Sequence, residues 1–386
     1  MIKKDFKEIF WGVNSTMIPV NEPCISKKEL EYVTEAIKTG WISSEGKFIK
    51  KFEDRFASYV QRKHGIAVNS GTNALILALR ALSLPKGSEV ILPSFTIISC
   101  ALACIYNNLI PVFVDSEEDT WNMGVSKIEE KITEKTKAIM PVHIYGHPVD
   151  MDGVLRIVEK YNLYVIEDFA EAIGSEYKGK KCGGFGDISC VSFYANKVIT
   201  TGEGGMCLTD NKDLAENLRQ LKNLAFVPDK RFIHYELGFN FRLTNVQAAI
   251  GLAQLERIEE HVKKKIWIGR TYNELLKPLQ EKGVAQLPAE KEWAKNTYWM
   301  YGVVLNQKVS LDAKTVMNRL AENGIQTRPF FYPLHKQPAF EKFDWYKKET
   351  LPVSENLYKY GFYLPTGLTL NQESIENVVK SLMKVL

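Results

Sequence analysis

The stretch SFYANKVITTGEGG, residues 192–205, decides the fold. An apolar segment that reads as a strand, CVSFYAN (190–196), runs directly into Lys197. A glycine-rich turn then separates this lysine from a second strand-like segment, GGMCLTD (204–210). A lysine that is partly desolvated in such a place has a lowered pKa and can form a Schiff base with a carbonyl group. A surface lysine is the alternative interpretation of this position taken alone.

Strand-like and helix-like segments alternate on the N-terminal side of this stretch. Continuous apolar runs predict buried strands at residues 64–72, 89–94, 110–116, 138–146 and 163–169. Apolar residues at helical spacing predict helices at residues 73–82, 96–107 and 151–162. This alternation is typical of an α/β domain with a mainly parallel sheet.

On the C-terminal side, the apolar periodicity predicts one long helix over residues 243–279. The run Lys263-Lys264-Lys265 inside it is interpreted as a solvated helix face. A helix of this length often joins a large domain to a smaller one. A strand-like segment at 298–305 and a helix-like segment at 313–324 then predict a second α/β domain.

These segments predict two domains with a boundary near the start of the long helix. We expect a large domain over residues 1–260 and a small domain over residues 261–386. Residues 1–16 are interpreted as an appended arm, because Met17 provides a second plausible start.

The bulk composition excludes several classes of protein. The chain has 386 residues, 45% of them hydrophobic, and a formal charge of +4. It carries no basic stripe with interleaved aromatic residues, so no nucleic acid partner is expected. It contains neither a signal peptide nor a run of about 18 apolar residues, so we expect a cytoplasmic protein without a membrane partner. The six scattered cysteines form no CxxC pair, which predicts reduced, mostly buried thiols and no metal site.

Two motifs upstream of Lys197 offer the remaining parts of a cofactor site. In NSGTNAL (69–75) a strand gives way to a helix, whose first amides can bind phosphate; simple capping by Ser70 or Thr72 is the alternative. In VIEDFAEA (165–172), Asp168 ends a buried strand, at the sheet edge where ligands bind. That carboxylate could hold a cation or a protonated ring nitrogen, or it could cap a helix.

Together the three motifs match what pyridoxal phosphate (PLP) requires: a phosphate anchor, a carboxylate for the pyridine nitrogen and a lysine for the aldehyde. The chain resembles the sugar aminotransferases of the DegT/DnrJ/EryC1/StrS family. The resemblance runs from about Ile18 to the C-terminus. It rests on IPVNEPCI (18–25), SGTNAL (70–75), PVFVD (111–115), HIYGHPVDMD (143–152), EDFAEAIGSEYKGKKCGGFGD (167–187), SFYANKVITTGEGGM (192–206) and GFNFRLTNVQAAIGLAQLE (238–256).

The resemblance implies the α/β architecture of PLP-dependent fold type I, which is aspartate aminotransferase-like. A large, mostly parallel sheet domain is followed by a smaller C-terminal α/β domain. It also implies that Lys197 binds PLP as a Schiff base and shuttles the proton of the transferred amine. Asp168 would pair with the pyridine nitrogen, and Glu171 would lie near the ring oxygen.

The phosphate and the subunit contacts follow from the same resemblance. Gly71 and Thr72 would give backbone N–H groups to the phosphate, and Ser192 would give its hydroxyl. Asn240 would reach the phosphate of the neighbouring subunit. The resemblance therefore implies a homodimer with two shared active sites.

Two positions depart from the family pattern. Ile97 stands where an aromatic residue often stacks on the cofactor, so stacking would depend on apolar contact alone. Phe169 replaces a residue that is usually small, and we expect it to alter the floor of the pocket.

The C-terminal half is most similar to family members that act on GDP-4-keto-6-deoxy-D-mannose with L-glutamate as the amine donor. The similarity lies in GLAQLERI (251–258), NTYWMYGVVL (296–305) and RPFFYPLHKQPAF (328–340). Arg328 and His335 are candidate contacts for the sugar or the diphosphate, and structural roles are open for both.

Three other functions stay open at this point. The substrate could be a UDP- or dTDP-linked keto sugar, or the chain could be a PLP-binding regulator without turnover. A related 3-dehydratase acts on the same GDP-linked sugar, but it carries histidine where Lys197 stands, so the lysine favours amino transfer.

Overall fold

The structure is a computed structural model that describes residues 17–227, 230 and 232–386. The arm expected over residues 1–16 lies outside this part of the chain. A seven-stranded sheet forms the centre of the molecule. The strand order is β1-β9-β8-β5-β4-β2-β3. The strands are β1 (His64–Val68), β2 (Glu89–Pro93), β3 (Ile110–Val114), β4 (Thr136–Ile139), β5 (Tyr164–Asp168), β8 (Ile188–Ser192) and β9 (Gly205–Thr209). Only β9 runs antiparallel to its neighbours in this sheet, which confirms the mostly parallel architecture.

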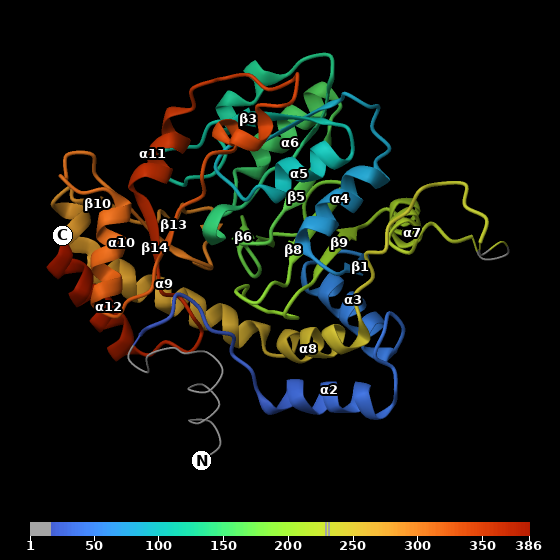
Figure 1. Ribbon diagram of the computed structural model, residues 1–386, viewed down its shortest axis with the longest axis horizontal. Helices are drawn as coiled ribbons and strands as arrows, with labels where there is room; N and C mark the ends of the chain where they lie inside the picture. The colour runs from blue at the N-terminus through green and yellow to red at the C-terminus, as the bar shows by residue number, and fades with distance from the viewer. Residues whose placement is uncertain (1–16, 228–229, 231) are drawn as a thin grey trace.

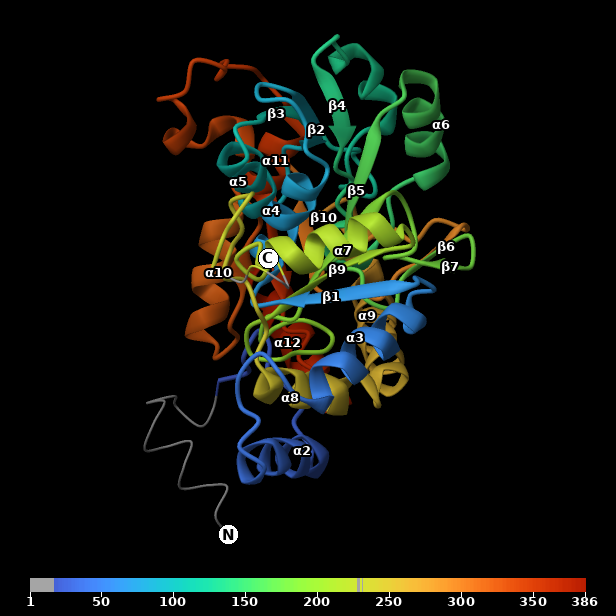
Figure 2. The ribbon, with the colours of Figure 1, turned by 90° about the vertical axis from the view of Figure 1, so that its right-hand side faces the viewer.

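Helices cover both faces of this sheet, as its apolar strands require. They include α4 (Gly71–Ala81), α5 (Ser99–Tyr106), α6 (Met151–Tyr161) and α7 (Lys212–Leu221). Ile91 and Val165 pack in one cluster with α6, whereas Leu92 and Ile166, the next residues along β2 and β5, pack in another with α4 and α5. This alternation places α6 on the face opposite α4 and α5 (Figure 2).

Side-chain caps set the ends of these helices. Ser70 accepts a hydrogen bond from the Asn73 amide at the start of α4, and Asp150 accepts one from the Gly153 amide in α6. Asn162 ends α6 in the left-handed conformation, with φ of 51°. Polar residues at these positions satisfy backbone groups that the helix itself leaves unpaired.

The strand predicted over residues 138–146 is shorter than expected. β4 ends at Ile139, and the next segment leads into a single 3-10 turn at Ile144–Gly146. Pro141 has no N–H to donate, which interrupts the regular ladder. After it, Val142 forms a single parallel bridge with Asp168, in which the Asp168 amide donates to the Pro141 carbonyl and the His143 amide donates to the carbonyl of Asp168.

The prediction of one continuous helix over residues 243–279 is wrong. The structure has two helices, α8 (Asn245–Leu255) and α9 (Ile258–Glu281), separated at Glu256 and Arg257. Glu256 forms ion pairs with Lys28 and Arg55, which tie this break to α2 (Lys27–Lys38) and α3 (Lys47–Tyr59). Figure 1 shows α8 and α9 following one another beneath both halves of the molecule, with α2 below α8.

The lysine run in α9 is not a uniformly solvated face. Lys263 is exposed and Lys264 is half-buried, but only 1% of Lys265 is exposed. The prediction is therefore wrong for Lys265. It lies four residues after the buried His261 and three before the buried Ile268, so helical geometry places it on the inward stripe.

A second, antiparallel sheet lies at the far end of α9, with the order β10-β12-β14-β13. Its strands are β10 (Ala285–Gln286), β12 (Tyr301–Leu305), β13 (Arg328–Pro329) and β14 (Gly361–Leu364). Three helices pack in its hydrophobic cluster: α9, α10 (Ala313–Glu322) and α12 (Gln372–Val385).

Several segments link the two sheets, so the domain boundary at residue 260 stays a prediction. A three-stranded sheet pairs β11 (Ala294–Lys295) with β6 (Glu176–Tyr177), which in turn pairs with β7 (Lys180–Lys181). Leu357 of α11 (Pro352–Tyr360) packs in the cluster of the large sheet, and Ile18 pairs with Ile325 beside the small one. In the part of the chain that is described, no helix is both long and apolar enough to span a bilayer.

Asp115, which follows β3, fixes α11 against the large sheet. Its carboxylate accepts hydrogen bonds from the Ser354 amide (2.8 Å) and hydroxyl (2.7 Å) and from the Val353 amide (3.1 Å). Burial acts to raise the pKa of Asp115, but the bonds from Ser354, Val353 and Ser116 outweigh it and hold the pKa below its usual value. The carboxylate thus serves as an ionised cap for α11.

We expect Asp115→Ala to lower the free energy of unfolding by roughly 2–4 kcal/mol at neutral pH, because it leaves buried donors unpaired. Since the folded-state pKa is depressed, this contribution is fully present above the unfolded pKa of about 4 and is lost as the pH falls through the lower folded value. Urea unfolding of wild type and variant between pH 7 and pH 3 measures the difference. A difference that does not shrink on acidification would contradict an ionised cap.

Candidate active site

A cavity of about 330 Å³ opens at the carboxyl ends of β5 and β8, beside the start of α4. Seven of the ten residues predicted for the site line it: Gly71, Thr72, Ile97, Asp168, Glu171, Ser192 and Lys197. Residues far apart in the sequence meet here because parallel strands end at one edge of the sheet. The predicted constellation is therefore assembled within a single chain, apart from three residues described below.

The first turn of α4 forms one end of the cavity. The helix begins at Gly71, so the backbone amides of Gly71 and Thr72 precede its first internal hydrogen bonds. A side chain at Gly71 would approach the Cβ atom of Ser192 to 2.7 Å, so glycine permits the close contact between α4 and β8. Ser70 caps the helix, and the backbone amides of Gly71 and Thr72 lie at the cavity end of α4. These two amides and the Ser192 hydroxyl fit a phosphate group.

Asp168 provides a buried carboxylate at the centre of the cavity. Its Oδ1 atom accepts a hydrogen bond from the Ala170 amide at 3.0 Å, and its Oδ2 atom accepts one from the Cys100 thiol at 3.4 Å. Burial raises the pKa of Asp168, while the Ala170 amide, the positive charge of Lys197 and the Cys100 thiol act to lower it. A carboxylate in this setting suits a cationic partner such as a protonated ring nitrogen.

Lys197 projects from the turn after β8, and its Nζ atom lies 3.6 Å from the centroid of the Trp299 ring. Burial lowers the pKa of Lys197, although the negative charges of Glu171 and Asp168 act in the opposite direction. Burial likewise raises the pKa of Glu171, whose Oε2 atom accepts a hydrogen bond from the Tyr145 amide at 2.9 Å. A lysine with a lowered pKa is more often neutral, as a nucleophile or base must be.

Three predicted residues do not line this cavity. His335 is 1% exposed, and its ring nitrogens contact the Ser94 hydroxyl (2.6 Å) and the Glu355 carboxylate (3.1 Å). Arg328 is exposed on β13, and its backbone lies opposite Tyr363 of β14 in the strand register. Tyr363 lines the cavity. Asn240 is exposed on the loop before α8.

The two departures from the family pattern have different surroundings. Ile97 is 43% exposed and lines the cavity, in keeping with apolar contact to a ligand. Phe169 does not line the cavity, and its ring is fully buried against Phe56 and Gly183. Its expected effect on the pocket floor stays a prediction.

Beneath the site, His143, Glu167 and Cys182 lie close enough together to resemble a metal centre. The polar atoms of His143 and Glu167 already have hydrogen-bond partners. The Val149 amide donates to His143 Nδ1, which leaves the Nε2 proton to face Glu167 at 3.0 Å. The same carboxylate accepts the Phe185 amide at 2.8 Å. This cluster is an internal brace for the end of β5.

The donors, acceptors and shape of the cavity fit PLP. A cradle of amides at a helix start suits its phosphate, a buried carboxylate suits its ring nitrogen, and a desolvated lysine suits its aldehyde. A family model described as the DegT/DnrJ/EryC1/StrS aminotransferase family matches residues 23–383. The chain belongs to this family.

Known relatives agree with this assignment. The chain is 42% identical over 365 residues to the GDP-perosamine synthase of Escherichia coli O157:H7, covering 95% of this chain and 97% of the relative. The structure of Helicobacter pylori PseC, an aminotransferase of pseudoaminic acid biosynthesis, superposes with a TM-score of 0.90 at 27% identity, covering 96% and 99% of the two chains. The PLP form of Spr1654 from Streptococcus pneumoniae, described as a candidate sugar aminotransferase, gives 0.87 at 25% identity, covering 96% and 100%.

As a member of the DegT/DnrJ/EryC1/StrS family, the protein is a sugar aminotransferase of fold type I with PLP as its cofactor. Several residues at the site are absent from the sequence-based predictions, among them Cys100 and Trp299. Cys100 was interpreted as one of several buried thiols, although its helix begins beside Asp168. Trp299 was assigned to a strand-like segment, and nothing in its local pattern indicates that it lies beside Lys197.

We expect Cys100→Ala to weaken PLP binding about fivefold, since loss of one donor to a charged group costs about 1 kcal/mol. Without the thiol, the pKa of Asp168 rises and the carboxylate holds a cationic ring less well. Cys100→Ser retains a donor and serves as the matched control. Equilibrium dialysis of PLP against both variants measures the effect, and equal affinity for the alanine and serine proteins would contradict it.

Proposed function

We propose that this protein is a sugar-nucleotide 4-aminotransferase that converts GDP-4-keto-6-deoxy-D-mannose and L-glutamate to GDP-perosamine and 2-oxoglutarate. The observation that carries the proposal is the 42% identity to a GDP-perosamine synthase over nearly the whole of both chains. The cavity supports it because Lys197, Asp168 and Ser192 line it together with the first residues of α4. UDP- and dTDP-linked keto sugars are the alternative substrates.

The residues of this chain divide the chemistry between them. When bound, PLP carries the amino group between the two substrates and delocalises the negative charge that forms on carbon. Asp168 keeps the proton on the ring nitrogen, which makes that delocalisation possible. Lys197 removes the α-proton of glutamate in the first half-reaction and delivers a proton to C4 of the sugar in the second. Trp299 and Phe331 line the same cavity and exclude water from the reacting atoms.

The test of the substrate is a product mass spectrum after incubation with PLP, glutamate and GDP-4-keto-6-deoxy-D-mannose. Conversion of the ketone to an amine, with one equivalent of 2-oxoglutarate formed, is the expected result. An unchanged sugar with 2-oxoglutarate still produced would discard this substrate and keep the aminotransferase. Parallel incubations with UDP- and dTDP-linked 4-keto sugars then identify the nucleotide that is used.

Lys197→Ala is expected to lower the rate of amine formation by about 10³-fold or more, because the variant lacks the amine that moves the proton. Lys212→Ala is the matched control, since Lys212 is highly exposed on α7. Both rates are measured by the appearance of 2-oxoglutarate. Retention of more than a tenth of the wild-type rate in Lys197→Ala would contradict the assigned role.

We also propose that the active unit is a homodimer in which Asn240 reaches the neighbouring site. Asn240 is exposed and lies outside the cavity of its own chain. The loop before it exposes apolar side chains that a second copy could cover: Phe232, Ile233, Tyr235 and Leu237. Such a cluster is unusual on the surface of a monomer.

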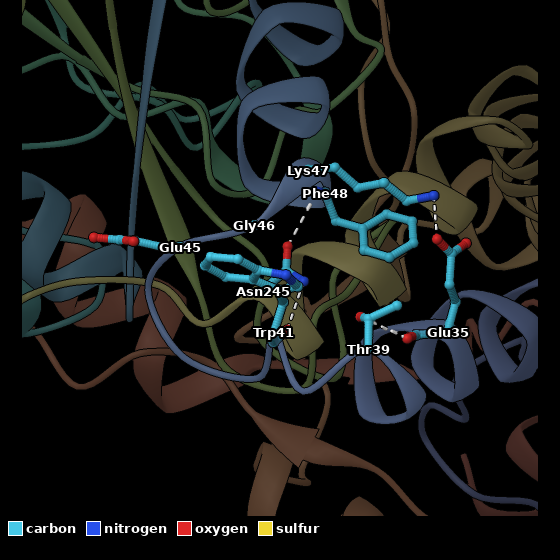
Figure 3. Close-up of a pocket in the computed structure, with 8 residues that line it drawn as sticks. All are labelled: Glu35, Thr39, Trp41, Glu45, Gly46, Lys47, Phe48 and Asn245. Atoms are coloured by element: carbon cyan, nitrogen blue, oxygen red, sulfur yellow. Dashed lines mark hydrogen bonds and ion pairs between the residues drawn. The ribbon is translucent and has the colours of Figure 1, made fainter.

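A second exposed apolar region supports the same assembly. Trp41 and Ile42 are each 54% exposed in the loop between α2 and α3. Figure 3 shows the side chain of Asn245, at the start of α8, between Trp41 and Phe48; it donates to the Trp41 carbonyl at 2.7 Å and accepts from the Phe48 amide at 3.0 Å. A loop that is pinned in this way presents Trp41 in a fixed position.

Subunit complementation tests the shared site. Lys197→Ala and Asn240→Ala chains carrying different affinity tags are co-expressed, and the hybrid is purified. Each hybrid then contains one site with both residues intact, so we expect about half of wild-type activity at limiting PLP. The two parent proteins should each be far less active under these conditions. A hybrid no more active than the mean of its parents would show that Asn240 acts within its own chain.

A further inference from the structure

Lys265 is a buried lysine without a carboxylate partner in the described part of the chain. It lies in the middle of α9 and is 1% exposed. Its Nζ atom donates hydrogen bonds to two backbone carbonyls, those of Trp299 at 3.0 Å and Thr366 at 2.6 Å. Burying an ammonium group without a counter-ion is costly, so carbonyl contacts alone are a poor way to gain stability.

The two carbonyls belong to the segments that flank the small sheet on the side of the cavity. Trp299 precedes β12, and Thr366 follows β14. The Thr366 hydroxyl also donates to the Trp299 carbonyl, at 3.1 Å. Lys265 therefore closes a triangle of hydrogen bonds that joins α9 to both segments and fixes the backbone at Trp299.

The side chain of Trp299 extends from this fixed point to the catalytic lysine. Its indole N–H donates to the carbonyl of Asn196 at 2.8 Å, and Asn196 directly precedes Lys197. The side-chain amide of Asn21 donates to the same carbonyl at 2.8 Å. Because the Lys197 amine lies 3.6 Å from the centre of the Trp299 ring, any shift of the indole moves the surface against which that amine rests.

We propose that Lys265 is a positioning residue for amino transfer, which holds the Trp299 indole in place against the amine of Lys197. The proposal rests on Lys197 being the reacting amine and is independent of which sugar nucleotide is used. It gives a reason for a buried ammonium that no carboxylate neutralises. Without Lys265, the segment before β12 is free to relax away from the turn that carries Lys197.

When Lys265 is charged, its charge also favours a reactive amine at Lys197. Burial, together with the smaller effect of the positive charge of Lys197, lowers the pKa of Lys265 to about 7. The repulsion is mutual, so a charged Lys265 favours the neutral amine at Lys197. The other groups whose charges act on Lys197 are Glu171, Asp168 and Cys100, which all favour its charged form.

The test compares Lys265→Met, which keeps the bulk of the side chain but removes its donors, with Lys265→Arg, which retains charge and donors. Lys264→Met is the matched control. Lys264 is the preceding residue, its Nζ atom lies 3.8 Å from the ring of Trp267, and it makes no contact with the cavity. Circular dichroism and melting curves establish that each full-length variant is folded.

The primary readout is the reactivity of the Lys197 amine in the protein freed of PLP. Each variant is treated with limiting acetic anhydride between pH 6 and pH 10, and labelling of the peptide containing Lys197 is quantified by mass spectrometry. We expect Lys265→Met to raise the labelling midpoint by roughly half a pH unit, because an indole that is no longer held leaves the Lys197 amine less buried, and burial is what lowers its pKa. Lys264→Met should match wild type, and Lys265→Arg should restore most of the shift.

A second readout separates positioning from general damage. In the holoenzyme, Lys265→Met should lower kcat by about tenfold and leave the KM for the amine donor within about twofold, as expected when a group aids the transition state without binding substrate. An unchanged labelling midpoint in folded Lys265→Met would overturn the proposal, whatever sugar the enzyme uses. If Lys265→Met does not fold, Trp299→Phe decides: it keeps the carbonyl bound by Lys265 but loses the indole N–H. A labelling midpoint equal to wild type in that variant also overturns the proposal.

Discussion

The burial of Asp168 is the constraint on which the active site depends. A carboxylate inside the protein must be offset by donors or by positive charge, and here an amide, a thiol and Lys197 provide both. Placing Lys197 close enough to act on Asp168 requires β8 to lie beside β5, which sets the order of the central strands. The same requirement brings the start of α4 against Ser192, because β8 carries both contacts. The buried carboxylate and its neighbours thus link the chemistry of the site to the pairing of β5 with β8.

Much of this arrangement is predictable from the sequence, because the information is local. The α/β alternation, the helix start at Gly71 and the strand end at Asp168 each follow from a short pattern of residues. Their convergence follows from the rule that parallel strands end at one edge. The predictions fail where a distant contact overrides a local pattern. The helix over residues 243–279 reads as continuous, but the ion pairs of Glu256 with α2 and α3 lie at a break that no local residue marks.

The residues that the sequence does not reveal are those whose role depends on another residue far along the chain. Cys100 looks like any buried thiol until the end of β5 places Asp168 beside it. Trp299 lies about a hundred residues from Lys197, and its segment reads only as a short strand. Lys265 is hidden by its two neighbours, because a run of three lysines is usually solvated. A helical spacing of four from His261 and three from Ile268 was the available signal, and it requires knowing which face of α9 is buried.

The C-terminal part of the chain contributes two kinds of residue to the active site, one that supports proton transfer and one that shapes the space for the sugar. Lys265 and the Thr366 hydroxyl hold the backbone carbonyl of Trp299, and neither residue lines the cavity. Phe331 and Tyr363, by contrast, line the cavity through their own side chains. Substitutions at these two positions can reshape the space for a sugar while the path of the backbone, and therefore Lys197, stays where it is. A family that acts on many sugar nucleotides needs this independence, since proton transfer tolerates far less displacement than sugar binding does.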